Sequence, residues 1–128
     1  MTNSLKTIDC FCGAGGLSIG FEKAGFNVIY AFDIDEASIK TYKNNPKYHH
    51  GKAFVRDIYK VTKKSIEEDI GCELGSIDVM IGGPPCQGFS VQRRGDDYDP
   101  RNQLILEYCR LINEIRPHFF VLENVGGL

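Results

Sequence analysis

The sequence predicts a doubly wound α/β fold with a mostly parallel sheet, and three observations support this prediction. Short apolar runs alternate along the chain with segments whose apolar residues recur at helical spacing. The apolar runs are nearly continuous, as in strands that are buried on both faces. Gly, Pro and Asn residues punctuate the boundaries between segments. Strands and helices that alternate in this way form a parallel sheet with helices on both faces.

Nine elements follow from these patterns, taken in chain order. The strands are the apolar runs, such as NVIYAFD. The first helix has a Gly near its end, the second stops at Asn residues and Pro46, the third is polar on one side, and the fourth is long and amphipathic. The elements are a strand at 6–12, a helix at 17–26, a strand at 27–33, a helix at 36–45, a strand at 53–58, a helix at 61–71, a strand at 76–82, a helix at 101–117 and a strand at 118–124.

Composition limits the class of protein. A chain of 128 residues with 42% hydrophobic and 25% charged residues suits one domain with a core. The net charge of −2 is not typical of a free-standing nucleic-acid binder, so either the partner is not nucleic acid or the basic surface lies elsewhere. Five cysteines without repeated spacing argue against a disulfide framework, and Cys10 and Cys12 are too close for a usual zinc pair. We therefore expect a cytoplasmic protein with no metal, no signal peptide and no membrane span.

The last predicted strand leaves an apolar edge. This strand at 118–124, which contains the run FFVL, is followed directly by VGGL (125–128), with no helix to cover it. Exposed apolar edges invite association with another strand. We therefore expect either part of a larger fold that is truncated after the fifth strand, or a half that needs another chain.

Ligands of doubly wound sheets bind at the carboxyl ends of the strands, near the point where the strand order reverses. The first strand is followed by FCGAGGLSIG (11–20). Its glycines let the backbone approach a ligand closely, and the amides of the next helix would face that ligand. This suits a nucleotide-like cofactor. The spacing is not G-x-G-x-x-G, which weakens a dinucleotide interpretation, and a tight structural turn is the alternative.

Acidic residues follow the second and third strands. Asp33 lies where a carboxylate accepts hydrogen bonds from ribose hydroxyls, while Asp35 or Asp33 could instead cap the next helix. Ile34 could pack on an adenine ring. Asp57, with Ile58, could take a base amino group, although a solvated loop acid is the commoner interpretation for such a residue alone.

The fourth and fifth strands lead to two candidate catalytic residues. In GGPPCQGFS (82–90), prolines fix the backbone around Cys86, which as a thiolate would be a nucleophile. A buried structural cysteine is the alternative. Glu123 follows FFVL and is expected to be poorly solvated, so that it could hold a proton and give it to a substrate; a helix cap or a rim acid is the alternative. The remaining cysteines are expected to be packing residues: Cys10, Cys12, Cys72 and Cys109.

Together these stretches resemble the cytosine-5 DNA methyltransferase family. The segment DCFCGAGGLSIGFEKAGF, the acid after the second strand, GGPPCQGFS and ENV occur in the family's order, and GGPPCQGFS together with ENV is specific to it. The resemblance implies a Rossmann-like methyltransferase fold, with residues 1–128 as the N-terminal part of the cofactor-binding and catalytic domain. The family's later QRR-type motif, target-recognition region and final helix motif are absent from these residues, and Gln92-Arg93-Arg94 is not at that motif's position.

The resemblance also implies S-adenosylmethionine as cofactor and assigns residues to it. These are Phe11, Gly13, Gly15, Gly16 and Leu17 for the methionine and adenosine region, Asp33 for the ribose, Ile34 for the adenine face, Asp57 and Ile58 for the adenine edge, and Pro85 and Leu104 as further pocket residues. Cys86 would attack carbon 6 of a flipped-out cytosine, and Glu123 would assist at ring nitrogen 3.

The implied function is a restriction–modification enzyme that methylates double-stranded DNA. A missing C-terminal region or second subunit would carry target recognition, so we expect little or no activity from this chain alone. Three alternatives stay open: a tRNA methyltransferase of the same family, a non-catalytic module that binds cofactor or a partner chain, and, more distantly, a nicotinamide-dependent oxidoreductase. The last has the wrong glycine spacing and leaves GGPPC unexplained.

Overall fold

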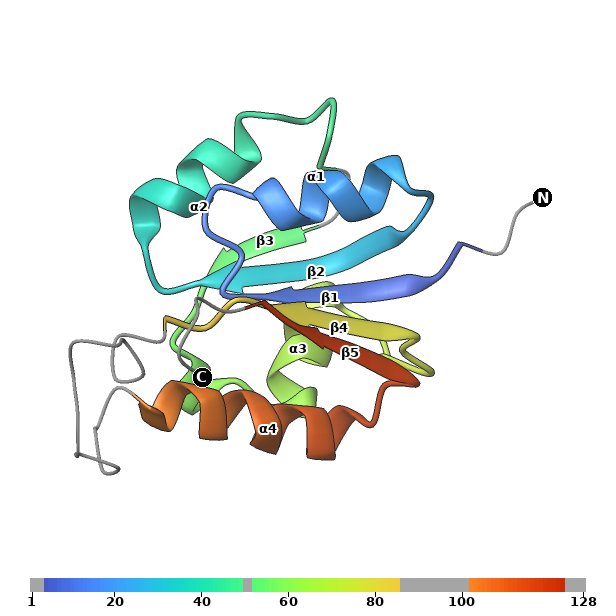
Figure 1. The fold of residues 1–128 in the computed structure, drawn as a ribbon, viewed down its shortest axis with the longest axis vertical. Helices are drawn as coiled ribbons and strands as arrows, with labels where there is room; N and C mark the ends of the chain where they lie inside the picture. Colours follow the sequence, from blue (N-terminus) through green and yellow to red (C-terminus); the bar gives the residue numbers. More distant parts are fainter. Residues whose placement is uncertain (1–3, 50–51, 86–101, 124–128) are drawn as a thin grey trace.

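A five-stranded parallel sheet lies between two layers of helices in the computed structural model, which describes residues 4–49, 52–85 and 102–123 (Figure 1). Helices α1 and α2 cover one face of the sheet, and α3 and α4 cover the other. The elements are β1 (Lys6–Cys10), α1 (Gly16–Lys23), β2 (Asn27–Asp33), α2 (Glu36–Lys43), β3 (Lys52–Val55), the 3₁₀ helix η1 (Ile58–Lys60), α3 (Lys63–Ile70), β4 (Val79–Gly82), α4 (Gln103–Ile115) and β5 (Phe119–Leu122).

The strand order β3-β2-β1-β4-β5 confirms the predicted doubly wound fold. All four neighbouring pairs are parallel. The chain moves outward from β1 to β3 and then returns to the other side of β1 with β4. The order therefore reverses between β1 and β4, and the carboxyl ends of these strands are where a ligand site is expected.

Some element boundaries differ from those predicted. The first strand ends at Cys10 because Phe11 has a φ of 57°, a left-handed conformation that a strand cannot contain. The third strand ends at Val55 and is followed by η1, which was not predicted. The side chain of Asp57 accepts a hydrogen bond from Tyr59 N and so caps this short helix.

Two apolar clusters hold the helices against the sheet. The larger one, on the α3 and α4 face, contains the aromatic side chains of Tyr30, Phe32 and Tyr108. Leu111 and Ile115 pack there from α4, which confirms the predicted apolar face of this helix. Full burial of a side chain of this size contributes about 1.5–3 kcal/mol. These contacts fix α4 on the sheet before any polar contact is considered.

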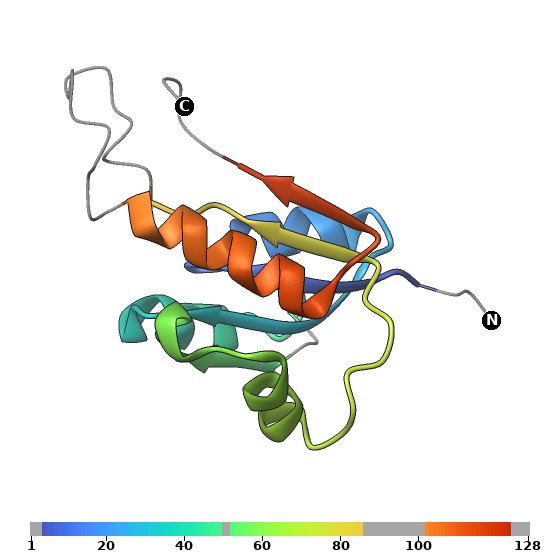
Figure 2. The same cartoon turned by 90° about the horizontal axis from the view of Figure 1, so that it is seen from below.

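Strand β5 forms an exposed apolar edge, as predicted. It lies at the outer edge of the sheet (Figure 2), and its residues Phe119, Phe120 and Val121 are 72%, 57% and 39% exposed.

Two of the cysteines differ from the prediction that they are packing residues. Cys72 and Cys109 are exposed, whereas Cys10 and Cys12 are buried as expected. No helix within the described residues is long and apolar enough to cross a membrane.

Candidate functional site

A cavity of about 140 Å³ opens at the carboxyl ends of β1, β2, β3 and β4, beside the start of α4. Most of its lining is apolar, with two carboxylates and one guanidinium among the side chains. Seven residues predicted from sequence lie together there. The lining residues are Phe11, Phe32, Asp33, Ile34, Arg56, Asp57, Ile58, Gly83, Pro85 and Leu104. A wider depression of about 350 Å³ lies at the amino ends of β1 and β2, away from these side chains.

Asp33 joins the glycine loop after β1 to the end of β2. Its Oδ2 accepts a hydrogen bond from Gly13 N at 2.9 Å, and its Oδ1 accepts one from Asp35 N at 2.8 Å. An ionised carboxylate offers about four acceptor positions, so Asp33 can accept further donors on its open side. Asp35 has the other predicted task, because its side chain accepts from Ser38 N and caps α2.

The cavity walls come from distant parts of the chain. Ile34 is 69% exposed at the rim, where an apolar ligand group could cover it. Asp57 and the buried Ile58 form the wall at η1, and Leu104 forms the wall at α4. These residues are far apart in sequence, and the parallel topology brings them together.

The structure does not place all predicted glycine-loop residues in this cavity. Gly15 is buried under α2, and a Cβ atom there would lie 2.5 Å from the ring of His49. Gly16 and Leu17 line a separate shallow hollow along α1. Gly15 is therefore required for packing between the loop and His49, whatever else the loop binds.

A buried carboxyl group lies in β1, directly before the glycine loop. Asp9 is 1% exposed, and its Oδ2 accepts a hydrogen bond of 2.5 Å from Ser18 Oγ in α1. Ser18 Oγ in turn accepts one of 3.1 Å from Tyr42 OH in α2. Burial raises the pKa of Asp9 to about 7, the hydrogen bond from Ser18 opposes that rise, and the charge of Asp33 adds to it. Sequence reasoning missed this group, and its only signal was an acid inside an apolar strand.

The two predicted catalytic segments follow neighbouring strands. Cys86 lies outside the described residues, which reach Pro85. Glu123 N donates to Gly82 O at 2.9 Å, and a Cβ atom at Gly83 would lie 2.7 Å from Glu123 Oε2. Gly83 thus leaves the space that the Glu123 carboxylate occupies. The expected poor solvation of Glu123 is wrong, because this residue is exposed at the end of an edge strand.

The fold and the cavity define a class: a doubly wound α/β protein with a cavity at its strand ends, where sheets of this kind bind their ligands. The chain matches the model of the C-5 cytosine-specific DNA methylase family over residues 5–128 and belongs to that family. The resemblance seen in the sequence is confirmed. The predicted cofactor, S-adenosylmethionine, is confirmed at the level of the family.

Individual relatives agree with this family. The chain is 47% identical to the type II methyltransferase M.AgeI of Thalassovita gelatinovora over 97% of its own length, and 43% identical to M.XorII of Xanthomonas oryzae over 94%. It superposes with a TM-score of 0.81 and 40% identity, over 97% of its length, on a protein described as a DNA modification methyltransferase encoded within an E. coli prophage. The chain spans 28% of the length of each of the first two relatives and 33% of the third.

Proposed function

We propose that this chain provides the cofactor site and the catalytic loop of a DNA cytosine-5 methyltransferase of the restriction–modification type. The observation that carries the proposal is the convergence of Asp33, Ile34, Asp57 and Leu104 on one cavity at the switch point. Glu123 and the loop that begins at Gly83 lie at the next strand ends. DNA is preferred to tRNA as substrate because relatives at 38–47% identity are named as type II methyltransferases.

The described residues fit the adenosine part of S-adenosylmethionine. Asp33 would accept hydrogen bonds from the ribose hydroxyls, Ile34 would cover one face of the adenine, and Asp57 would accept from its amino group. The cavity of about 140 Å³ is smaller than the roughly 300 Å³ of a complete ligand pocket, so these residues hold one part of the cofactor. When bound, the cofactor supplies an electrophilic methyl group.

The chemistry assigned to this chain is covalent catalysis on cytosine. The Cys86 thiolate adds to carbon 6 of the ring, while Glu123 donates a hydrogen bond or proton to nitrogen 3, and carbon 5 becomes nucleophilic. Once carbon 5 has taken up the methyl group, its proton passes to water, the electron pair of that C–H bond expels the Cys86 thiolate, and the proton on nitrogen 3 returns to Glu123, which restores the aromatic ring. A duplex hides carbon 6, so the target base must leave the stack before Cys86 can reach it.

The cofactor site is tested by calorimetric titration of this chain with S-adenosylmethionine, with NADH as comparator. We expect binding of S-adenosylmethionine alone. Asp33→Ala should weaken it by about 10- to 100-fold, because a hydrogen bond to a charged group contributes about 1.5–3 kcal/mol. Asp35→Ala is the matched control, since this neighbouring carboxylate caps α2 and does not line the cavity. Equal losses in the two variants, or equal binding of NADH, would contradict the site.

The catalytic part is tested in a full-length protein that contains this chain. Cys86→Ser should abolish transfer of a labelled methyl group to cytosine-containing duplexes and leave S-adenosylmethionine affinity unchanged. Loss of both together would mean that Cys86 is structural. Unchanged transfer would mean that another group is the nucleophile.

A further inference from the structure

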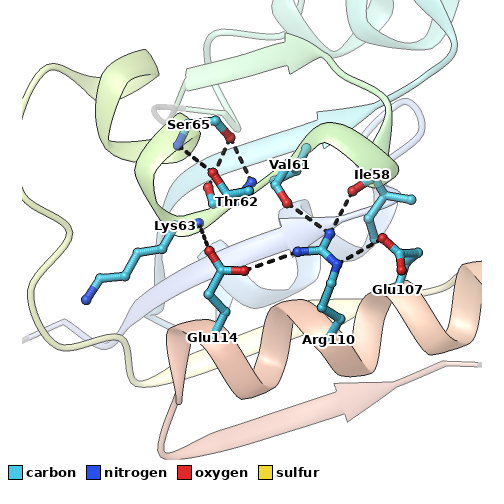
Figure 3. Close-up of polar contacts among 8 residues, drawn as sticks. All are labelled: Ile58, Val61, Thr62, Lys63, Ser65, Glu107, Arg110 and Glu114. Carbon is cyan, nitrogen blue, oxygen red and sulfur yellow. Dashed lines mark hydrogen bonds and ion pairs between the residues drawn. The ribbon is translucent and has the colours of Figure 1, made fainter.

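Arg110 of α4 contacts the segment that follows β3 (Figure 3). Its Nη2 donates hydrogen bonds of 2.9 Å to both Ile58 O and Val61 O, the carbonyls of the first residue of η1 and of the residue that follows it. These acceptors lie 52 and 49 residues earlier in the chain. In both bonds the donor is charged, and such hydrogen bonds are stronger than those between neutral groups.

Two glutamates of the same helix hold the guanidinium in place. Glu107 Oε1 accepts from Arg110 Nε at 2.9 Å, and Glu114 Oε2 accepts from Arg110 Nη1 at 3.1 Å. Glu114 Oε1 also accepts from Lys63 N at 2.7 Å, at the start of α3. The planar group is thereby oriented from both sides, and its remaining donor edge faces η1. A lysine ammonium lacks this planar fork and cannot reproduce the arrangement.

A surface ion-pair network is the simpler explanation, and it accounts for only part of this geometry. Pairs between Arg110 and the glutamates at i−3 and i+4 are common on helices and contribute little. They do not require contact with η1. Nor is Arg110 needed to dock α4, since Tyr108, Leu111 and Ile115 already bury the helix against the sheet.

The contact between Arg110 and η1 affects the proposed cofactor cavity, because η1 contributes to its lining. Asp57 and Ile58, at the start of η1, form one wall of that cavity. Leu104, six residues before Arg110 in α4, forms another wall of the same cavity. The bond from Arg110 to Ile58 O therefore links the element that carries one wall to the residue that forms the other.

We propose that Arg110 is a positioning residue for the adenine side of the cofactor pocket: by joining α4 to η1, it sets the separation between Leu104 and the Asp57–Ile58 wall. This inference rests on the proposed function. It adds a residue that lies outside the cavity and acts through the backbone of η1. The expected consequence is selectivity for the adenine amino group, because Asp57 must be held at a fixed place to accept from it.

The test compares Arg110→Met with the wild-type chain and with Ile39→Val. Ile39 is buried in the other apolar cluster, on the opposite face of the sheet, so its substitution loosens packing without touching η1. The ligands are S-adenosylhomocysteine and S-inosylhomocysteine, in which an oxygen replaces the adenine amino group. Calorimetry gives both dissociation constants for each protein. The Lys60 and Val61 amides donate the hydrogen bonds of η1 to Asp57 O and Ile58 O. Hydrogen exchange at these amides reports, without ligand, how firmly η1 is held.

We expect Arg110→Met to raise the exchange rate at these two amides at least tenfold and to weaken the binding of S-adenosylhomocysteine by about five- to tenfold. The affinity for S-inosylhomocysteine should change less than twofold, so the ratio of the two affinities, which measures the preference for adenine, should fall. Arg110→Lys should recover part of this preference, and Ile39→Val should keep all of it. Equal weakening of both ligands in Arg110→Met, or unchanged affinities, would overturn the inference. Failure of the wild-type chain to bind S-adenosylhomocysteine would instead overturn the proposed cofactor site, and the inference with it.

Discussion

Replacing Asp9 by asparagine should flatten the pH dependence of folding stability between pH 4 and 8. Asp9 is buried beneath the glycine loop, where Ser18 Oγ donates to one carboxyl oxygen. The other oxygen, Oδ1, has no hydrogen-bond partner among the described residues. Asparagine keeps an acceptor for Ser18 but cannot ionise. The variant therefore removes the titration while keeping the shape of the side chain.

The magnitude follows from the pKa of this carboxyl in the two states. Burial raises the pKa of Asp9 from 3.8 to about 7 in the folded protein. Between these values the folded state keeps a proton that the unfolded state has released, so stability falls as pH rises and levels off above about pH 7. At about 1.4 kcal/mol per pKa unit, the total loss is on the order of 4 kcal/mol.

Asp69, a partly buried carboxylate, does not mimic this behaviour. Partial burial of Asp69 is outweighed by hydrogen bonds from Arg56 and Tyr30, which lower its pKa. Asp69 therefore contributes stability that is present above pH 4 and is lost only on further acidification. Its titration falls below the range in which Asp9 acts.

Urea unfolding of both proteins at intervals between pH 4 and 8 measures the effect. The wild type should lose stability across this range while Asp9→Asn stays nearly level, so that the two curves separate as pH rises. The variant should be the more stable protein at pH 8. Parallel curves for the two proteins would refute the reasoning, because they would mean that Asp9 titrates alike in the folded and unfolded states.

Two further predictions concern packing and the sheet edge. Gly15→Ala should destabilise the fold by about 3 kcal/mol in chemical denaturation, because its φ is +102° and the new Cβ would lie 2.5 Å from the His49 ring. Gly13→Ala, with a φ of +55° and open space for a Cβ, should cost only about 1 kcal/mol, and equal costs would contradict the role of His49. Phe119→Lys, at a side chain that is 72% exposed, should change stability by less than about 0.5 kcal/mol but reduce self-association in light scattering. A large loss of stability would show that β5 needs Phe119 for folding.

The strand–helix order was predictable because each strand is a continuous apolar run. The prediction for β2 agrees with the structure at both ends, Asn27 and Asp33. The positions of Asp33 and Asp57 in the site were also predictable, since parallel topology brings successive strand ends to one edge of the sheet. The end of β1 could not be predicted. Phe11 has a left-handed conformation there, and phenylalanine rarely adopts it, so the sequence does not indicate it.

The polar contacts behind the site could not be predicted from local pattern. Arg110 finds its carbonyl acceptors about 50 residues away, and a helical arginine with glutamates at i−3 and i+4 fits an ordinary solvated face. The burial of Asp9 depends on how α1 and α2 cover β1. Glu123 was predicted to be poorly solvated from the apolar run before it, but that run lies in an edge strand whose side chains are largely exposed.

The pairing of β4 with β5 fixes one distance in this protein independently of loop length. Gly82 lies opposite Leu122, so Gly83 and Glu123 leave two adjacent strands at the same level of the sheet. Neighbouring strands are about 4.8 Å apart whatever their side chains are. Insertions or deletions between Cys86 and α4 can therefore accumulate without moving the acid relative to the start of the cysteine loop. Proteins built this way can diverge widely in that segment, and engineered loops can be exchanged there, provided that position 83 stays glycine.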